Sequence, residues 1–132
     1  MKKILQPAGW MKPKGYANGI VATGRFVAIA GQIGWNERGE FAGDDIVSQA
    51  VQALKNIIAI LAEADGKPEH IVRLTWYVTD KHAYLATAHE IGVSYKDLMR
   101  GFYPAMSLVE VAALLEDRAK VEIEATAIVP LT

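Results

Sequence analysis

The stretch FYPAMSLVEV, Phe102–Val111, combines an aromatic pair, a proline and an alternating run that is typical of a strand. Pro104 fixes its own φ and favours an extended backbone at Tyr103, so we expect the strand to begin here. The residues that follow alternate between two faces, one formed by Ser107, Val109 and Val111 and the other by Met106, Leu108 and Glu110. A second alternating run covers residues 121–129 beyond the charged segment 116–118, and the two runs predict a hairpin or a sheet corner.

Short apolar runs and turn residues mark the elements upstream. A strand is expected at Lys3–Leu5, followed by a loop to residue 17 that is rich in proline and glycine. The apolar runs Gly19–Ala22 and Arg25–Ile33 are separated by Thr23-Gly24, which predicts a hairpin with a two-residue turn. Both faces of the second run are apolar, so this strand should be covered on both sides.

Helical spacing predicts two helices. Apolar residues recur at this spacing from Val47 to Leu61, after Asp44 or Asp45 as a cap and before a stop at Gly66. Residues 71–79 then alternate as a strand, and a second helix is expected over residues 81–100, capped by Asp80 and ended by Gly101.

The element order β-β-β-α-β-α-β-β indicates an α+β fold in a single domain, residues 1–132. Two helices of this length can cover one face of a five- to six-stranded sheet but not both. The other face still carries apolar residues, namely Ala28, Val109, Val111 and, depending on register, Val121 or Ile123. Because an uncovered apolar face is usually buried against another chain, we expect a homo-oligomer.

The composition excludes several kinds of site. The chain has no cysteine, which rules out disulfides and thiolate chemistry and fits a cytoplasmic protein. The formal charge is −1, without long runs of like charge, which argues against a nucleic-acid surface. No apolar run suits a signal peptide or a membrane span. The histidines, His70, His82 and His89, lack metal-ligand spacing, and no nucleotide-binding fingerprint is present, so neither metal nor cofactor is expected.

Acidic residues lie inside an apolar strand pattern near the C-terminus. Glu122 and Glu124 share one face, opposite Val121, Ile123 and Ala125, and a solvated edge strand would explain them as well as a site would. Carboxylates beside apolar walls have raised pKa values and can hold or transfer a proton. Arg73, unusual in mid-strand, is expected to pair with one of these glutamates or with Glu110.

Five segments stand in the order and spacing of the RidA family, also called the YjgF or endoribonuclease L-PSP/translation-inhibitor family. They are Ala30–Ile33 (AGQI), Tyr77–Asp80 (YVTD), Tyr103–Ala105 (YPA), Ser107–Val111 (SLVEV) and Val121–Ala125 (VEIEA). The chain resembles this family from about residue 15 to residue 129. The resemblance implies a chorismate-mutase-like fold of the bacillus type and a homotrimer with ligand clefts between subunits. Active members hydrolyse 2-imino or enamine compounds to 2-keto acids and ammonia without cofactor or metal.

The resemblance also implies site residues. Glu122 corresponds to the glutamate that positions the attacking water, and Tyr16 to a loop tyrosine that closes the cleft. Ala30-Gly31-Gln32 corresponds to a Ser-Gly-Gln strand end, so the serine hydroxyl is missing here. A helix residue that is often Asn falls near His89 or Gly92.

The largest departure from the family lies in Ala105-Met106-Ser107, where active deaminases have Ala-Arg-Ser. That arginine holds the substrate carboxylate through a bidentate pair. Methionine has neither charge nor donors, and its thioether suits an apolar or aromatic ligand. The chain thus resembles the subgroup without this arginine, for which Arg73 is a candidate substitute cation. Four aromatic residues could line such a site or belong to the core: Trp35, Tyr77, Phe102 and Tyr103.

Three functions are compatible with this pattern. The first is a cofactor-free deaminase-type hydrolase for an imine, enamine or aminomuconate-like compound. In this enzyme Glu122 activates water, and backbone groups near Gly31 and residues 105–107 orient the ligand. Its activity on small imino acids is expected to be weak. The second is a non-catalytic trimeric protein that uses the same clefts to bind a small molecule or to serve a regulatory role. The third is the endoribonuclease or translation inhibitor of the family's older name, which the charge balance does not support.

Overall fold

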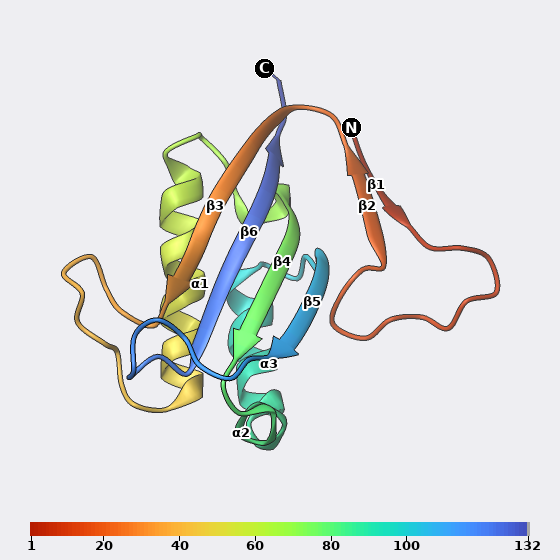
Figure 1. The fold of residues 1–132 in the computed structure, drawn as a ribbon. Coiled ribbons are helices and arrows are strands. Elements are labelled where there is room, and N and C mark those ends of the chain that lie inside the picture. Colours follow the sequence, from red (N-terminus) through yellow and green to blue (C-terminus); the bar gives the residue numbers. More distant parts are fainter. Residues whose placement is uncertain (132) are drawn as a thin grey trace.

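The computed structural model describes residues 1–131 and confirms an α+β fold. Figure 1 shows a twisted sheet in front of the helices and a separate two-stranded ribbon on one side. The elements, in chain order, are β1 (Lys2–Leu5), β2 (Gly19–Ala22), β3 (Arg25–Ile33), α1 (Ile46–Ala62), the 3-10 turn η1 (Pro68–His70), β4 (Ile71–Val78), α2 (Lys81–Ala86), α3 (Ala88–Leu98), β5 (Ala105–Glu110) and β6 (Val121–Val129).

The strands form two sheets rather than one. The main sheet has four strands in the order β3-β6-β4-β5, and β1 and β2 form a sheet of their own. Within the main sheet β6 is antiparallel to both neighbours, whereas β4 and β5 are parallel. The six expected strands are therefore present, but the expectation of one five- to six-stranded sheet is wrong for the described chain.

The predicted hairpin of residues 19–22 with residues 25–33 is wrong, and so is the hairpin alternative for the two C-terminal runs. β2 pairs with β1, with Ala22 opposite Lys2, and β3 pairs with β6. Gly24, in the expected turn, has φ +154° and lies so close to the end of β6 that an added Cβ would be 2.9 Å from the Val129 carbonyl carbon. Glycine therefore lets the chain cross from one sheet to the other at this point. β5 cannot pair with β6 because β4 lies between them.

All three α-helices lie on one face of the main sheet, as Figure 1 shows. α1 contacts β3 and β6, and α3 contacts α1. The shared core contains fully buried residues from the sheet and from α1: Leu74, Trp76, Val78, Val121, Ile123, Ala50, Ala53, Leu54, Ile57 and Leu61. Asp45 caps α1 as predicted, and its Oδ2 accepts a hydrogen bond from the Ser48 backbone N–H at 2.9 Å.

The second helix is interrupted, contrary to prediction. Thr87 has φ −115° and ψ 12°, which ends α2 and starts α3. Its hydroxyl donates a hydrogen bond to the Ala83 carbonyl at 2.8 Å, in place of the backbone bond that a continuous helix would make. Asp80 caps α2 as expected, and Gly101, with φ +78°, donates its N–H to the Lys96 carbonyl beyond the end of α3.

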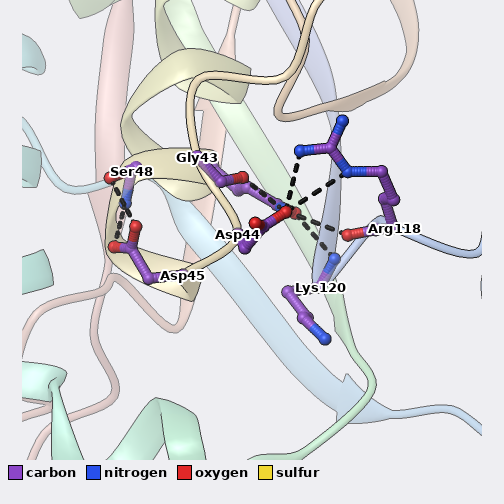
Figure 2. A network of polar contacts seen from close by, with 7 residues as sticks. Gly43, Asp44, Asp45, Ser48, Arg118 and Lys120 are labelled. Carbon is purple, nitrogen blue, oxygen red and sulfur yellow. Dashed lines mark hydrogen bonds and ion pairs between the residues drawn. The ribbon is translucent and has the colours of Figure 1, made fainter.

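A buried glutamine ties α1 to two loops. Gln49 is fully buried, and its Nε2 donates to the Gly43 carbonyl at 2.9 Å and to the Arg118 carbonyl at 3.0 Å. Its Oε1 accepts from the Lys120 backbone N–H at 2.7 Å. Figure 2 shows this network together with the exposed Arg118–Asp44 ion pair. The contacts fix the approach to β6 against the start of α1.

The sheet face opposite the helices is uncovered in the single chain, and we call it the open face. On β4 and β6 it carries mainly polar residues: Arg73, Thr75, Tyr77, Glu122, Glu124 and Thr126. Val121 and Ile123, the apolar alternatives expected here, are fully buried on the helix side. Apolar exposure is instead found towards the sheet edges, where Phe26 is 68% and Val109 45% exposed. β3 is accordingly covered on one side only.

Candidate functional site

Glu122 lies on β6, an interior strand, so the interpretation of its strand as a solvated edge is wrong. Its neighbours Val121 and Ile123 point into the core, which turns the carboxylate to the open face. The carboxylate lies directly against Gly31 of β3, where an added Cβ would be 2.7 Å from Glu122 Cδ. Only glycine leaves room for the carboxylate in this position.

The backbone around Gly31 is irregular. The register of β3 against β6 shifts between Ile29 and Gln32, which places Ala30 and Gly31 in a bulge. Gln32 Nε2 donates to the Ala30 carbonyl at 3.1 Å. Bulges occur frequently beside active sites because they redirect backbone groups. The structure therefore brings together four of the predicted residues: Glu122, Ala30, Gly31 and Gln32.

Arg73 lies on the same open face but in a different surrounding. It lines a hollow of about 350 Å³ with Thr75, Tyr77, Glu124 and Thr126. Within residues 1–131, no ion pair joins Arg73 to Glu110, Glu122 or Glu124, contrary to expectation. Glu124 instead accepts a hydrogen bond from the Tyr77 hydroxyl at 2.5 Å, and this bond raises the pKa of Tyr77.

Met106 faces the opposite side of the sheet. It pairs with Leu74 across β5 and β4 and contacts the core beneath the helices. There it lines a pocket of about 220 Å³ whose other large side chains are Lys14, Trp76, Tyr84, Tyr95 and Tyr103. We call this the aromatic pocket. Ser107, the next residue, is exposed on the open face, so these two neighbouring residues of β5 lie on opposite faces of the sheet.

The aromatic pocket is built from rings in mutual contact. The Trp76 ring lies 6.1 Å from that of Tyr84 and 6.2 Å from that of Tyr95, and Tyr95 stacks on Tyr103 at 5.9 Å. Burial raises the pKa of both Tyr84 and Tyr95, so their hydroxyls stay protonated at neutral pH. Among the described residues that line the pocket, Lys14 alone is charged.

The loop before β2 and helix α3 both contribute to the walls of the pocket. The Ala17 N–H donates to the Pro104 carbonyl at 3.0 Å, which holds the loop with Lys14, Gly15 and Tyr16 beside β5. Tyr16 is 38% exposed and lines an adjacent groove with Tyr103. On α3, Gly92 lines the aromatic pocket, whereas His89 is exposed and does not.

Ala105 marks the edge where these surfaces meet. It pairs with Arg73 on one side and forms an isolated bridge with Ala17 on the other. Of the aromatic residues singled out from the sequence, Tyr103 lines the aromatic pocket, whereas Tyr77 lies on the open face. Trp35 instead contacts Phe41 in the loop after β3.

Three of the pocket's rings, those of Trp76, Tyr84 and Tyr95, were not among the site residues predicted from the sequence. The sequence signal that could have found the pocket is that an inward-facing tryptophan precedes a helix with tyrosines on its inner face. Their polar atoms need partners when they are buried.

Residues 1–131 contain no group of three or more potential metal ligands and no helix that is long and apolar enough to cross a membrane.

The fold and the two surfaces define a mixed α+β domain of the kind found in YjgF proteins. The family model described as endoribonuclease L-PSP matches residues 11–129. A RutC family protein of Pasteurella multocida is 36% identical over 108 residues, which cover 82% of this chain and 83% of that protein. The chain belongs to the endoribonuclease L-PSP family, which is the RidA or YjgF family of the sequence resemblance.

Two further relatives connect the chain to a named activity and to a solved structure. A 2-iminobutanoate/2-iminopropanoate deaminase of Salmonella typhimurium is 35% identical over 113 residues, 86% of each protein. The crystal structure of a Rid family protein of unknown function from Yersinia pestis has a TM-score of 0.82 at 32% identity, covering 97% of this chain and 98% of that one. The family is therefore one that includes imine deaminases.

Proposed function

We propose that the protein is a cofactor-free hydrolase that cleaves the C–N bond of an imine or enamine, with a substrate preference different from that of the small-imine deaminases. The observation that carries the proposal is the position of Glu122 against the bulge at Gly31. A carboxylate held beside redirected backbone groups can take a proton from water while those groups hold a polar substrate.

The reaction needs no redox partner. Water adds to the imine carbon as its proton passes to Glu122, and the resulting carbinolamine loses its nitrogen as ammonia after that proton is returned. The products are a keto compound and ammonia. The relative from Salmonella that is named 2-iminobutanoate/2-iminopropanoate deaminase supports this class of chemistry.

The site would be assembled from two copies of the chain. Glu122 lies on the open face and Met106 on the helix side, so one sheet separates them within a single chain. The exposed Phe26 and Val109 on the open face favour contact with another subunit. Both observations support the homotrimer with clefts between subunits that the family resemblance implies.

Met106 determines the expected substrate preference. Active deaminases of the family resemble one another in having an arginine at this position, which forms a bidentate pair with the substrate carboxylate. Loss of this pair raises the activation free energy by a few kcal/mol, or lowers the rate by roughly two to three decades. We therefore expect weak activity on 2-iminopropanoate. Lys14 is the cation that lies in the same pocket as Met106, whereas Arg73 lies across the sheet.

The test is ammonia release from 2-iminopropanoate generated in situ, comparing the wild type with Met106→Arg. We expect Met106→Arg to gain about 100-fold, because it restores the carboxylate clamp. Met106→Leu is the matched control, since it keeps an apolar wall and should gain nothing. Glu122→Gln should remove the activity in both backgrounds.

Two results would overturn the proposal. The first is wild-type turnover as fast as that of the Salmonella deaminase, which would show that the substitution is irrelevant. The second is the lack of any gain by folded Met106→Arg and by Met106→Lys. In that case a non-catalytic binding protein, which the aromatic lining of the pocket also favours, becomes the better interpretation. A binding protein would be stabilised by its ligand without consuming it.

A further inference from the structure

Residues 1–18, which form β1 and the loop before β2, are an exposed segment that we call the N-terminal arm. Figure 1 shows it to one side of the main sheet. From residue 1 to residue 16 every residue is exposed except the partly buried Pro13. The exposed residues include Trp10, at 64%, and Met11, at 90%, together with Ile4 and Leu5 of β1. Exposed apolar residues gathered in one segment mark a surface that contacts a partner or a lipid.

The tip of the arm has a defined conformation. The Trp10 N–H donates to the Pro7 carbonyl at 3.2 Å, and Gly9 has φ +84°, as in a type II turn. Gln6 Nε2 donates to the Trp10 carbonyl at 3.3 Å, and Gln6 Oε1 accepts from Asn18 Nδ2 at 2.9 Å. These bonds tie the turn to both ends of the loop. Because the turn is already formed, docking it on a surface costs little additional conformational entropy.

The charge of the arm has one sign. It contains four lysines and no acidic residue, although the whole chain has a net charge of −1: Lys2, Lys3, Lys12 and Lys14. Within residues 1–131 none of these lysines forms an ion pair. The arm therefore offers uncompensated positive charge beside its exposed apolar residues.

A lipid surface with anionic headgroups suits both properties. Tryptophan is enriched at membrane–water interfaces because its ring is apolar and its N–H is polar. Lysines beside inserted apolar residues are attracted by anionic headgroups. A nucleic acid is also an anion, but single strands bind through several stacked rings. Ile4, Leu5 and Met11 offer no ring, so the composition of the arm favours lipid.

We propose that the N-terminal arm docks on a membrane surface that contains anionic phospholipid. Trp10 and Met11 enter the headgroup region, and Lys3 and Lys12 contact the anionic headgroups. The contact is peripheral and reversible, because only a few apolar side chains are inserted. Glu122 and Met106 lie outside the arm, so this inference does not depend on the proposed hydrolase function.

The test is sedimentation of the full chain with vesicles of phosphatidylcholine and phosphatidylserine in a ratio of about 3 to 1, with phosphatidylcholine vesicles as the uncharged probe. We expect the mixed vesicles to bind at least about 10-fold more tightly. Binding should weaken as the salt concentration rises from about 0.1 M to about 1 M, because the Debye length falls from about 10 Å to about 3 Å.

The variants separate charge from insertion. Lys3→Gln combined with Lys12→Gln should weaken binding to the mixed vesicles roughly 25-fold, from about 5-fold for each lysine. The matched control combines Lys55→Gln and Lys96→Gln, which change the net charge equally on α1 and α3 and should have far less effect. Trp10→Ala should weaken binding about 10-fold.

Tryptophan fluorescence supplies a second readout. Mixed vesicles should shift the emission of the wild type to shorter wavelength, and Trp10→Ala should abolish this shift, whereas Trp35→Phe should retain it.

Four results would overturn the proposal. The first is equal binding to the two kinds of vesicle, and the second is an equal loss of binding in the arm variant and the control variant. The third is tighter binding to a single-stranded oligonucleotide than to the mixed vesicles, which would assign the arm to nucleic acid. The fourth is a lower oligomer mass in Trp10→Ala by light scattering without vesicles, which would show that another copy of the chain covers the arm.

Discussion

Replacing Gln49 with leucine should destabilise the protein strongly although it leaves the helix pattern of α1 intact. The side chain is fully buried and makes three hydrogen bonds of 2.7–3.0 Å to the backbone of Gly43, Arg118 and Lys120. Leucine has a similar volume but no donor or acceptor, so all three backbone groups lose their partner. At about 1 kcal/mol net for each bond, the loss of unfolding free energy is about 3 kcal/mol.

The measurement is urea unfolding followed by far-UV circular dichroism, together with the melting temperature. For a domain of 132 residues, a loss of about 3 kcal/mol corresponds to a fall of roughly 10 °C in melting temperature. Gln52→Leu is the matched control, because Gln52 lies on the same helix and its side chain bonds to Asn56 alone among the described residues. All variants are compared at one protein concentration, since subunit association also stabilises.

The reasoning is refuted if Gln49→Leu unfolds at the same urea concentration as the wild type. It is also refuted if Gln52→Leu loses as much stability as Gln49→Leu. Either result would show that the network in Figure 2 does not hold the start of α1 to the segment before β6.

Two further predictions concern Gly31 and Asp45. Gly31→Ala should displace the Glu122 carboxylate and, in the Met106→Arg background, lower ammonia release from 2-iminopropanoate by about 100-fold. The melting temperature should change little, because the displaced atoms lie at the end of a flexible side chain. Unchanged turnover would contradict this prediction. Asp45→Ala should cost about 1 kcal/mol of unfolding free energy at pH 7. The hydrogen bond from Ser48 lowers the pKa of Asp45, so this contribution is present above the ordinary carboxyl pKa and lost as the pH falls through the lowered value. Urea unfolding of both proteins at pH 7 and below pH 3 should show the difference shrinking, and a constant difference would exclude the capping charge as its cause.

Local elements were predictable because their signals lie within a few residues of one another. The helical spacing from Val47 to Leu61 identified α1, and Asp45 and Asp80 were correctly expected as caps. Two local predictions failed: the hairpin turn at Thr23-Gly24, and the unbroken helix at Thr87, where a side-chain hydroxyl bonds to the preceding turn and divides the predicted helix. Apolar periodicity continues across this break, so the pattern could not reveal it.

Strand pairing was not predictable from the alternation of residues. Neighbouring strands were expected to pair as hairpins, but β3 and β4 both pair with β6, which is distant from them in sequence. The hydrogen bonds between strands involve the backbone, which is the same for every residue type, so the sequence does not name the partner. The pairing partner of each strand is instead determined by how the strands pack beneath the helices.

The alternation of residues is enough to show that Glu122 and the core residues beside it point in opposite directions, since side chains alternate along any strand. The sequence also contained the five segments that place the chain in its family. The folded chain was needed to show that Glu122 and Met106 lie on opposite sides of the sheet, because the helices bury Val121 and Met106 on the same side. It likewise gathered Trp76, Tyr95 and Lys14 around one pocket, because residues far apart in sequence meet only when the chain packs around its core.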